Sequence, residues 1–599
     1  MKIGFFSLAS ALCVILVVPA MAKKELIIES LPLDNYSKKS SKNKSKRSQQ
    51  VEKWVTSSGG LQEKEVTRRF YLQAILHGAE YGNYVPVSLL EEAYVKDFYK
   101  KRKYKTVWFS AGFTINPMTF SLLEFLRDVS EEGLNPEKYH LFEIDTILDE
   151  IKNDDTISKR NRNLALAQVD ILLSDAFLAV AKDLREGEID FGAFEAYLYE
   201  KNEAEETTLK WEKPRMRADY VDFLEWVLQK KHLKESLLSL VTTNELYHLF
   251  KEAHIRYEKI AEEGGWKKIP YGKRLRLGTR SKYRVPLLAK RLHMTGDLDT
   301  FDANVTRVNG EIQAALKHYQ KRMGLWESGT LNEITRKTLN VSVKRRLSQI
   351  KLNMERSRWE RRPFGSDYVW INIPEYRMKL IRDGLADIDM RVVVGKVSNP
   401  TPIFTSKFSY VVVNPTWTVP SSIVKNEMLH RIQEDPDYLE THHFKLIKDK
   451  KRNREIDGFE IDWWQFDDES DFPFQFVRAA GPGNPLGKVK FMFPNPYAIY
   501  MHDTPDKYLF KNRKRAYSHG CIRLHKPQEF LDYVEANFMQ NLDENQTEMI
   551  NSPQTHEIPL DKNIPTFIRY YTTWVENDGT VNFRADVYGY DKIQSQFLK

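Results

Sequence analysis

Cysteine is scarce in this sequence. Only two of the 599 residues are cysteines, Cys13 and Cys521. Cys13 lies in an N-terminal apolar segment that we expect to be removed, so the mature chain should carry one thiol. A lone thiol excludes a disulfide framework, and the chain also lacks the closely spaced cysteine pairs of structural zinc sites. Cys521 is therefore a candidate nucleophile, with a buried structural cysteine or a zinc ligand as the alternatives.

Long hydrophobic runs are equally scarce. One spans residues 3–18, after Met1-Lys2 and before Pro19-Ala20-Met21-Ala22, and we find no later transmembrane segment. The charged start, apolar centre and small residues at the end are typical of a secretory signal peptide over residues 1–22. The run is shorter than the ~20 residues of a spanning helix, although an uncleaved anchor is the alternative. Export together with a free thiol predicts the periplasm of a bacterial cell envelope.

Excess charge is modest and partly local. The net charge is +8, and residues 37–48 form a polar, basic run without apolar side chains. Residues 23–60 are accordingly predicted to be a disordered basic linker. We interpret this linker as a solvated tether, and contact with acidic wall polymers or a membrane surface is the alternative. No folded nucleic-acid reader is evident, so we expect no nucleic-acid partner.

The length suggests about three or four domains. Apolar residues recur with helical spacing as far as about residue 286, and a shorter helical unit follows. Beyond Gly365, short runs of β-branched and aromatic residues are broken by Pro, Gly and Asp turns, as in strands. The predicted fold class is multidomain α+β. Its parts are a helical scaffold at 61–286, a small helical bundle at 287–342, a connecting helix at 343–364, and a mostly β domain at 365–599 that closes in a hairpin over 566–588.

One insertion interrupts the β domain. Residues 421–488 show no strand pattern and contain many aromatics, including Trp463, Phe472, Phe474 and Phe476. A long segment of this kind beside a catalytic stretch is often functional. We predict a capping subdomain that acts as a mobile lid, with its Gly-Pro-rich exit as the hinge. The alternative is that the aromatics only form a satellite core.

The candidate chemistry lies in residues 500–524. In Ser518-His519-Gly520-Cys521, glycine before the thiol allows a sharp turn that aims the amides of Gly520 and Cys521 at a developing oxyanion. His502 ends an apolar run that is typical of a strand. It is a candidate base for the thiol, because a thiolate paired with imidazolium can have a strongly lowered pKa. Either the neighbouring Asp503 or a backbone carbonyl is expected to orient His502.

The pattern of His502 followed by Ser518-His519-Gly520-Cys521-Ile522-Arg523-Leu524 resembles the signature of YkuD-type L,D-transpeptidases. The resemblance implies that Cys521 is the nucleophile, that His502 is the general base and acid, and that the backbone of His519, Gly520 and Cys521 forms the oxyanion site. The scaffold region resembles that of the large multidomain members, and residues 287–342 resemble a peptidoglycan-binding module. Candidate substrate contacts are Tyr500, Ser518, Arg523 and Trp417.

The resemblance also implies an activity. A tetrapeptide stem of peptidoglycan would acylate Cys521, and a diaminopimelate amine would accept the acyl group, which serves cell-wall biogenesis and cell shape. No metal or cofactor is needed, and carbapenems are expected to acylate the same thiol. Two alternatives stay open: a wall-binding structural protein with little activity, and a zinc-dependent hydrolase that uses Cys521 with His502, His519 or His525.

Overall fold

The computed structural model describes residues 67–77, 88–109, 115–153, 156–205, 208–213, 218–360, 363–449, 454–467, 470–540, 548 and 552–598. The predicted signal peptide at 1–22, with Cys13, and the basic linker at 23–60 lie outside these residues. The described chain forms two compact units. The first takes its residues from 1–128, 136–186 and 214–240, and the second from 129–135, 187–213 and 241–599.

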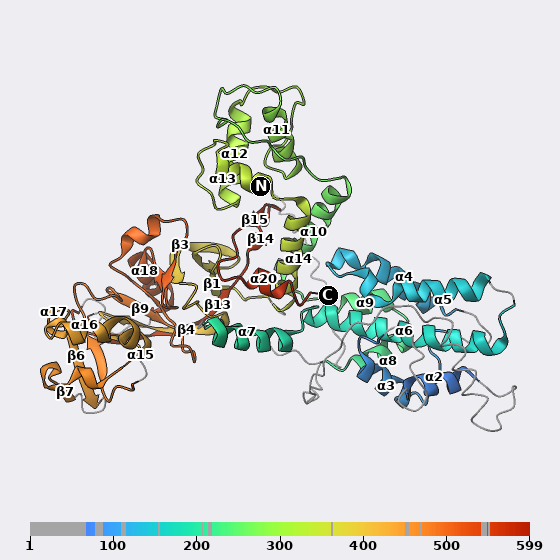
Figure 1. Cartoon of the computed structure of the whole chain (residues 1–599), viewed down its shortest axis with the longest axis horizontal. Helices are drawn as coiled ribbons and strands as arrows, with labels where there is room; N and C mark the ends of the chain where they lie inside the picture. The colour runs from blue at the N-terminus through green and yellow to red at the C-terminus, as the bar shows by residue number, and fades with distance from the viewer. Residues whose placement is uncertain are drawn as a thin grey trace, which may run out of the picture. The chain divides into compact units, whose positions relative to one another are not determined.

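The first unit is helical. Its longest helix is α6 (Lys159–Glu186), whose side chains from Leu166 to Leu184 are almost all buried (Figure 1). By length and composition α6 could cross a membrane, but 83% of its apolar stretch is buried inside the protein, as in a core helix. The other helices are α2 (Arg68–Leu76), α3 (Glu92–Lys101), α4 (Pro117–Asp128), α5 (Leu141–Asn153), α8 (Tyr220–Lys230) and α9 (Leu233–Leu238).

The second unit contains a helical portion around α14 (Val343–Arg358). An apolar cluster joins side chains of this helix to those of four helices and a hairpin: α10 (Glu245–Glu262), α11 (Arg284–Met294), α12 (Gly310–Arg322), α13 (Glu333–Leu339), β14 (Thr573–Val575) and β15 (Val581–Phe583). α10 therefore belongs to this unit, although the sequence places it in the scaffold at 61–286.

Buried polar side chains of α14 hold the C-terminal segment. Asn353 Nδ2 donates to Thr572 Oγ1 at 2.9 Å, and the amide of Thr572 donates back to Asn353 Oδ1 at 2.9 Å. Arg356 pairs with Asp591 at 2.8 Å and donates to the carbonyl of Tyr570 at 3.0 Å. The buried Arg356 thus has an acidic partner inside the protein, where an unpaired charge would be costly.

The candidate catalytic domain is built on a nine-stranded sheet of order β11-β3-β12-β10-β9-β4-β13-β1-β2. The sheet closes on itself through one long strand, because residues 385–391 of β3 pair with β2 while residues 392–395 pair with β12 and β11. The bounds are β1 (Asp367–Asn372), β2 (Arg377–Arg382), β3 (Leu385–Gly395), β4 (Phe404–Val413), β9 (Val489–Met492), β10 (Met501–His502), β11 (Ala516–Ser518), β12 (Ile522–Leu524) and β13 (His556–Arg569).

One face of this sheet is covered by α18 (Pro527–Phe538). Phe530 of α18 is fully buried, and its ring lies 4.7 Å from that of Phe491 on β9 and 5.9 Å from that of Phe408 on β4. Phe491, Met501 and Ile522 lie in one row across β9, β10 and β12 and are buried. Because side chains alternate along a strand, the residues beside them point to the opposite face.

The insertion at 421–488 is not free of strands, so this part of the sequence interpretation is wrong. β6 (Phe444–Asp449), β7 (Arg454–Ile456) and β8 (Gln475–Arg478) form a second sheet with β5 (Trp417–Thr418), in the order β5-β8-β6-β7 (Figure 1). The strands were missed because they are short and lie among charged residues. Trp463, Phe472, Phe474 and Phe476 belong to a separate core within the insertion, as the satellite-core alternative predicts.

The hairpin at the end of the domain is shorter than expected. Residues 566–569 are the end of β13, which pairs with β4 and β1, and only β14 and β15 form the hairpin. Gly579, in the predicted Asp-Gly turn, has φ +81°, a backbone conformation that side chains with a Cβ rarely adopt.

Replacing Phe530 with alanine should destabilise the catalytic sheet by about 3–5 kcal/mol, because it leaves a cavity between α18 and the sheet. Chemical denaturation followed by tryptophan fluorescence would measure the loss. Gln528→Ala, on the exposed face of the same helix, is the matched control and should change stability little. Equal effects of the two substitutions would contradict the packing described here.

Candidate active site

Parallel pairing of β10 with β12 brings the two predicted catalytic residues to the same place. Met501 pairs with Ile522 and His502 with Arg523. The amide of Ile522 donates to the carbonyl of Tyr500 at 3.0 Å, which extends the pairing by one residue. Cys521 therefore lies beside Tyr500, at the N-terminal edge of β12.

The same pairing sets the face on which the site lies. His502 is opposite Lys490 on β9 and beside Arg523 on β12, so these three residues form one cross-strand row. Tyr500 and Cys521 precede His502 and Arg523 by two residues and share their face. This face is opposite the row of Phe491, Met501 and Ile522 that faces the core.

The turn before Cys521 requires glycine. Gly520 has φ +113°, and a Cβ at this position would lie 3.0 Å from Ile499 Cδ1. Ser518, which is buried, donates from Oγ to the carbonyl of Cys521 at 2.5 Å and accepts from the amide of Gly520 at 3.2 Å. The hydroxyl of Ser518 is therefore engaged in holding the turn, which argues against the expectation that Ser518 contacts substrate.

Two residues outside the motif also hold the turn. Thr401 Oγ1 donates to the carbonyl of Gly520 at 2.7 Å, and the amide of Thr401 donates to the hydroxyl of Tyr588 at 3.2 Å. The hydroxyl of Tyr588 in turn donates to the carbonyl of Gly395, at the end of β3. Sequence reasoning missed both residues, because nothing in the motif signals partners that lie about 70 to 120 positions away.

The predicted oxyanion donors are only partly available. The amide of Gly520 already donates to Ser518, whereas that of Cys521 has no acceptor among the described residues. A backbone amide without a protein acceptor at the nucleophile is suited to receive a developing oxyanion. Of the expected donors, Cys521 is thus better placed than Gly520.

The thiol of Cys521 is half-buried and protonated at neutral pH. Burial raises its pKa to about 11, and this effect outweighs hydrogen bonds from the Tyr500 amide and hydroxyl and the nearby positive charges of Arg523 and Lys490. The thiol also lies 3.8 Å from the carbonyl of Ala498.

His502 is buried and neutral. Burial and the flanking cations Arg523 and Lys490 lower its pKa to about 3. Its Nδ1 lies 2.5 Å from the carbonyl of Asp503, and because a carbonyl only accepts, Nδ1 carries the proton and Nε2 can accept one. The backbone carbonyl of Asp503, and not its carboxylate, is therefore the group that orients the imidazole.

The carboxylate of Asp503 holds the surrounding backbone. It accepts from the amides of Thr504 at 2.6 Å and Lys488 at 2.9 Å, and it pairs with Lys507 at 2.7 Å. Lys488 follows directly on the Gly-Pro-rich exit of the insertion. This exit is thus fixed to the residue that orients His502, which argues against its acting as a free hinge.

A resting thiolate–imidazolium pair, which the sequence interpretation considered, is not supported. Cys521 and His502 are both neutral, and no hydrogen bond joins them in the described part of the chain. The physical reason is that both groups lose hydration, which disfavours their charged forms. Deprotonation of the thiol must therefore accompany its attack on a substrate.

The side chain of His519 faces the insertion. Its Nε2 lies 2.6 Å from Glu427 Oε1 and 3.1 Å from Lys396 Nζ. Glu427 belongs to η4 (Val424–Met428), a π-helical turn near the start of the insertion. This contact agrees with the expectation that only the backbone of His519 belongs to the catalytic machinery.

Two more of the four candidate substrate contacts, Arg523 and Trp417, have structural partners. Arg523 pairs with Asp506 at 2.9 Å, while its Nε is buried without a hydrogen-bond partner. Trp417, on β5, packs against the core of the insertion, with its ring 6.2 Å from that of Phe444. Trp417 is thus a residue of the insertion sheet.

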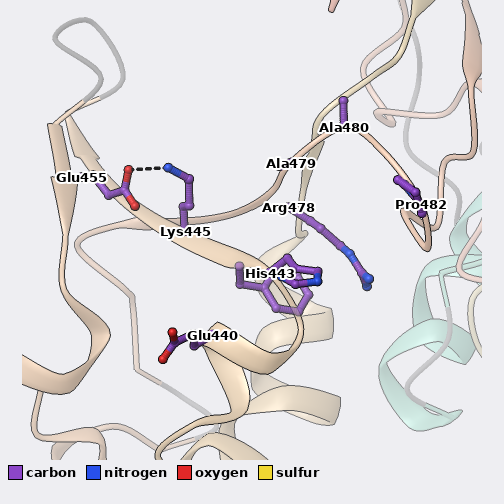
Figure 2. Close-up of a pocket in the computed structure, with 9 residues that line it drawn as sticks. Glu440, His443, Lys445, Glu455, Arg478, Ala479, Ala480 and Pro482 are labelled. Atoms are coloured by element: carbon purple, nitrogen blue, oxygen red, sulfur yellow. Dashed lines mark hydrogen bonds and ion pairs between the residues drawn. The ribbon is translucent and has the colours of Figure 1, made fainter. Parts of the chain in front are cut away.

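A cavity of about 560 Å³ lies within the insertion and not at Cys521. Figure 2 shows the guanidinium of Arg478 extending past His443, while an ion pair of 2.8 Å joins Lys445 and Glu455 on neighbouring strands. The remaining lining residues are Glu440, Phe444, Ala479, Ala480 and Pro482.

Comparison with known proteins gives the class of this domain. Residues 366–550 match the YkuD family, described as the L,D-transpeptidase catalytic domain, and residues 93–253 match a family described as the Scaffold domain. Residues 366–550 therefore form a YkuD-type L,D-transpeptidase catalytic domain, as the sequence motif predicts. The multidomain α+β fold class is likewise confirmed.

A curated relative matches part of the chain. A Haemophilus influenzae protein provisionally named an L,D-transpeptidase is 34% identical over 244 residues, which are 40% of this chain and 48% of that protein. The matched part thus spans about half the length of this curated relative.

Solved structures of L,D-transpeptidases are only weakly similar to this chain. An L,D-transpeptidase from Stackebrandtia nassauensis is 13% identical, with 50% of this chain and 96% of that chain covered and a TM-score of 0.19. L,D-transpeptidase 3 from Mycobacterium tuberculosis, in complex with a faropenem-derived adduct, is 12% identical, with 35% and 62% covered and a TM-score of 0.17. These TM-scores are too low to support an argument about the fold or the residues of this chain.

Alkylation of Cys521 by iodoacetamide should accelerate steadily as pH rises. Only the thiolate reacts, and with a pKa of about 11 its fraction grows about tenfold per pH unit from pH 6 to 10. Mass spectrometry of the peptide that contains Cys521 would follow the rate, with the urea-unfolded chain as the control that levels off near its ordinary pKa. A plateau in the folded protein from pH 5 upward would instead indicate a thiolate–imidazolium pair.

Proposed function

We propose that this protein is a peptidoglycan L,D-transpeptidase that acts through an acyl-enzyme on Cys521. The observation that carries the proposal is the shared sheet face of a half-buried thiol and a neutral histidine with a fixed proton on Nδ1. A base must be unprotonated to accept a proton at neutral pH, and His502 meets this condition. The donor is a tetrapeptide stem, and the acceptor is a diaminopimelate side-chain amine.

The first half of the reaction forms a thioester. The sulfur of Cys521 attacks the carbonyl at the L-centre of the third stem residue as His502 Nε2 takes the thiol proton. The C–N bond then breaks, and the leaving D-alanine amine receives that proton from His502. The Cys521 amide stabilises the negative charge that develops on the carbonyl oxygen.

The second half returns the thiol. The acceptor amine attacks the thioester carbonyl, His502 takes one proton from it, and the C–S bond breaks. The proton then passes to the sulfur, so the enzyme ends in its starting state. A metal ion has no role in these steps. A zinc site at Cys521 would need neighbouring histidines, but His519 faces Glu427 and His525 Nε2 lies 3.3 Å from Arg391.

The other parts of the chain are proposed to serve a function in the cell envelope. We propose that residues 1–22 direct export to the periplasm, that the linker at 23–60 is a tether, and that residues 287–342 form a peptidoglycan-binding module. The insertion at 421–488 caps the thiol, and its contact between Glu427 and His519 supports this role. Carbapenems should acylate Cys521, because their strained amide is open to the same attack.

Cys521→Ala should abolish the acyl-enzyme while leaving the fold intact, because the change removes one small side chain. Purified wild type incubated with tetrapeptide stems should gain the mass of the acyl group on Cys521 and release D-alanine, and a stem acceptor should then yield dimers. Circular dichroism would verify the fold of the variant. Dimer formation by the variant would refute Cys521 as the nucleophile.

His502→Ala should slow acylation by about 10²–10⁴-fold, because it removes the proton acceptor. His519→Ala should cost far less, since its side chain contacts Glu427 and only its backbone lies at the thiol. Single-turnover acylation rates would rank the two variants. The opposite order would mean that the roles of the two histidines are reversed.

A further inference from the structure

Lys490 is a half-buried cation at the thiol to which no step above gives a role. It lies on β9 directly opposite His502, and its Nζ is 5.5 Å from the centre of the Tyr500 ring. Tyr500 is also the residue that donates to the sulfur of Cys521. The ammonium is thus on the same face as the thiol, and the attraction between Lys490 and Cys521 affects the pKa of both groups.

Lys490 lacks the carboxylate partner that neighbouring cations have. Arg523 pairs with Asp506 at 2.9 Å and Lys507 with Asp503 at 2.7 Å, but no ion pair engages Lys490 among the described residues. In its own row, the nearest acid is Glu557 on β13, an exposed residue separated from Lys490 by Val412 of β4. Burial accordingly lowers the pKa of Lys490.

Burying an ammonium without a counter-ion costs free energy. The position of Lys490 beside the thiol therefore points to an anionic ligand. In the proposed reaction the leaving residue is the last of the donor and ends in a free carboxylate. Only its amide nitrogen and α-carbon separate that carboxylate from the attacked carbonyl, so the anion lies within roughly 5 Å of the sulfur. A lysine ammonium suits it, because a point charge on a flexible stem follows an anion without fixed geometry.

We propose that the ammonium of Lys490 binds the terminal carboxylate of the leaving residue and thereby selects donors that end in a free carboxyl group. The inference rests on the proposed function and adds the group that recognises the leaving residue. Lys490 makes and breaks no bond. It orients the donor so that the carbonyl before the last residue lies at the sulfur of Cys521. The ring of Tyr500 lies beside the bound carboxylate.

Two alkylating reagents test this without any transpeptidation. Iodoacetate carries a carboxylate and iodoacetamide is its neutral analogue, so the ratio of their rates at Cys521 measures attraction of an anion while any change in thiol pKa cancels. Lys490→Met should lower the ratio of iodoacetate to iodoacetamide rates by about fivefold or more, as expected for one charge near the sulfur. Lys490→Arg should retain most of the ratio.

The matched control is Lys407→Met, which removes the same charge from an exposed position on β4 of the same sheet. It should leave the ratio unchanged. An unchanged ratio in Lys490→Met, or an equal fall in both methionine variants, would overturn the proposal.

A second measurement concerns the donor itself. The wild type should acylate with a tetrapeptide stem far faster than with its C-terminal amide, and Lys490→Met should lose most of this preference through KM. Equal use of acid and amide by wild type would overturn the assignment of Lys490 to the leaving residue. If neither peptide acylates any variant, the proposed function fails, while the alkylation ratios still decide whether Lys490 attracts a carboxylate.

Discussion

Parallel pairing between β10 and β12 is the constraint on which the site depends. Two residue pairs and one further backbone hydrogen bond determine that Tyr500 lies beside Cys521 and His502 beside Arg523. A slip of one residue would turn His502 into the core, since neighbours on a strand face opposite sides. The core row of Phe491, Met501 and Ile522 prevents that slip, because packing against α18 fixes which side is inward. Burial of apolar side chains on one face of the sheet thus determines that His502 and Cys521 lie on the opposite face.

The insertion and the base are joined by Asp503. Its carboxylate accepts from the amide of Lys488, where the insertion ends, while its carbonyl accepts from His502. Near the other end of the insertion, Glu427 contacts His519 within the nucleophile turn. The insertion therefore touches both halves of the site, and a ligand that displaced it would act on the base and the turn together.

Much of the site could be predicted from the sequence, because its chemistry is local. Ser518, Gly520 and Cys521 lie within four residues, and the need for glycine follows from backbone geometry alone. Several strands of the main sheet were recognised from short runs rich in β-branched and aromatic residues, whereas β13, the longest strand, was recognised only at its end. The short strands β6, β7 and β8 were missed, since charged neighbours hide the alternation of a sheet that is exposed on one side. Protonation states were not predictable, because burial of Cys521 and His502 arises only when distant strands come together. Lys490 was missed for the same reason, as its role depends on its partner across the sheet.

Tyr588, which helps to hold the nucleophile turn, is synthesised after Cys521. The turn that carries Cys521 is held by Thr401, whose amide donates to the hydroxyl of Tyr588, a residue 67 positions after Cys521. β13, the strand between β4 and β1, also follows the nucleophile in sequence. A chain that has emerged only as far as Cys521 consequently has its thiol but lacks the parts that shape the turn. Cys521 is thus synthesised before Tyr588 and β13, so its thiol reaches its place on the face of His502 only after these later residues have folded.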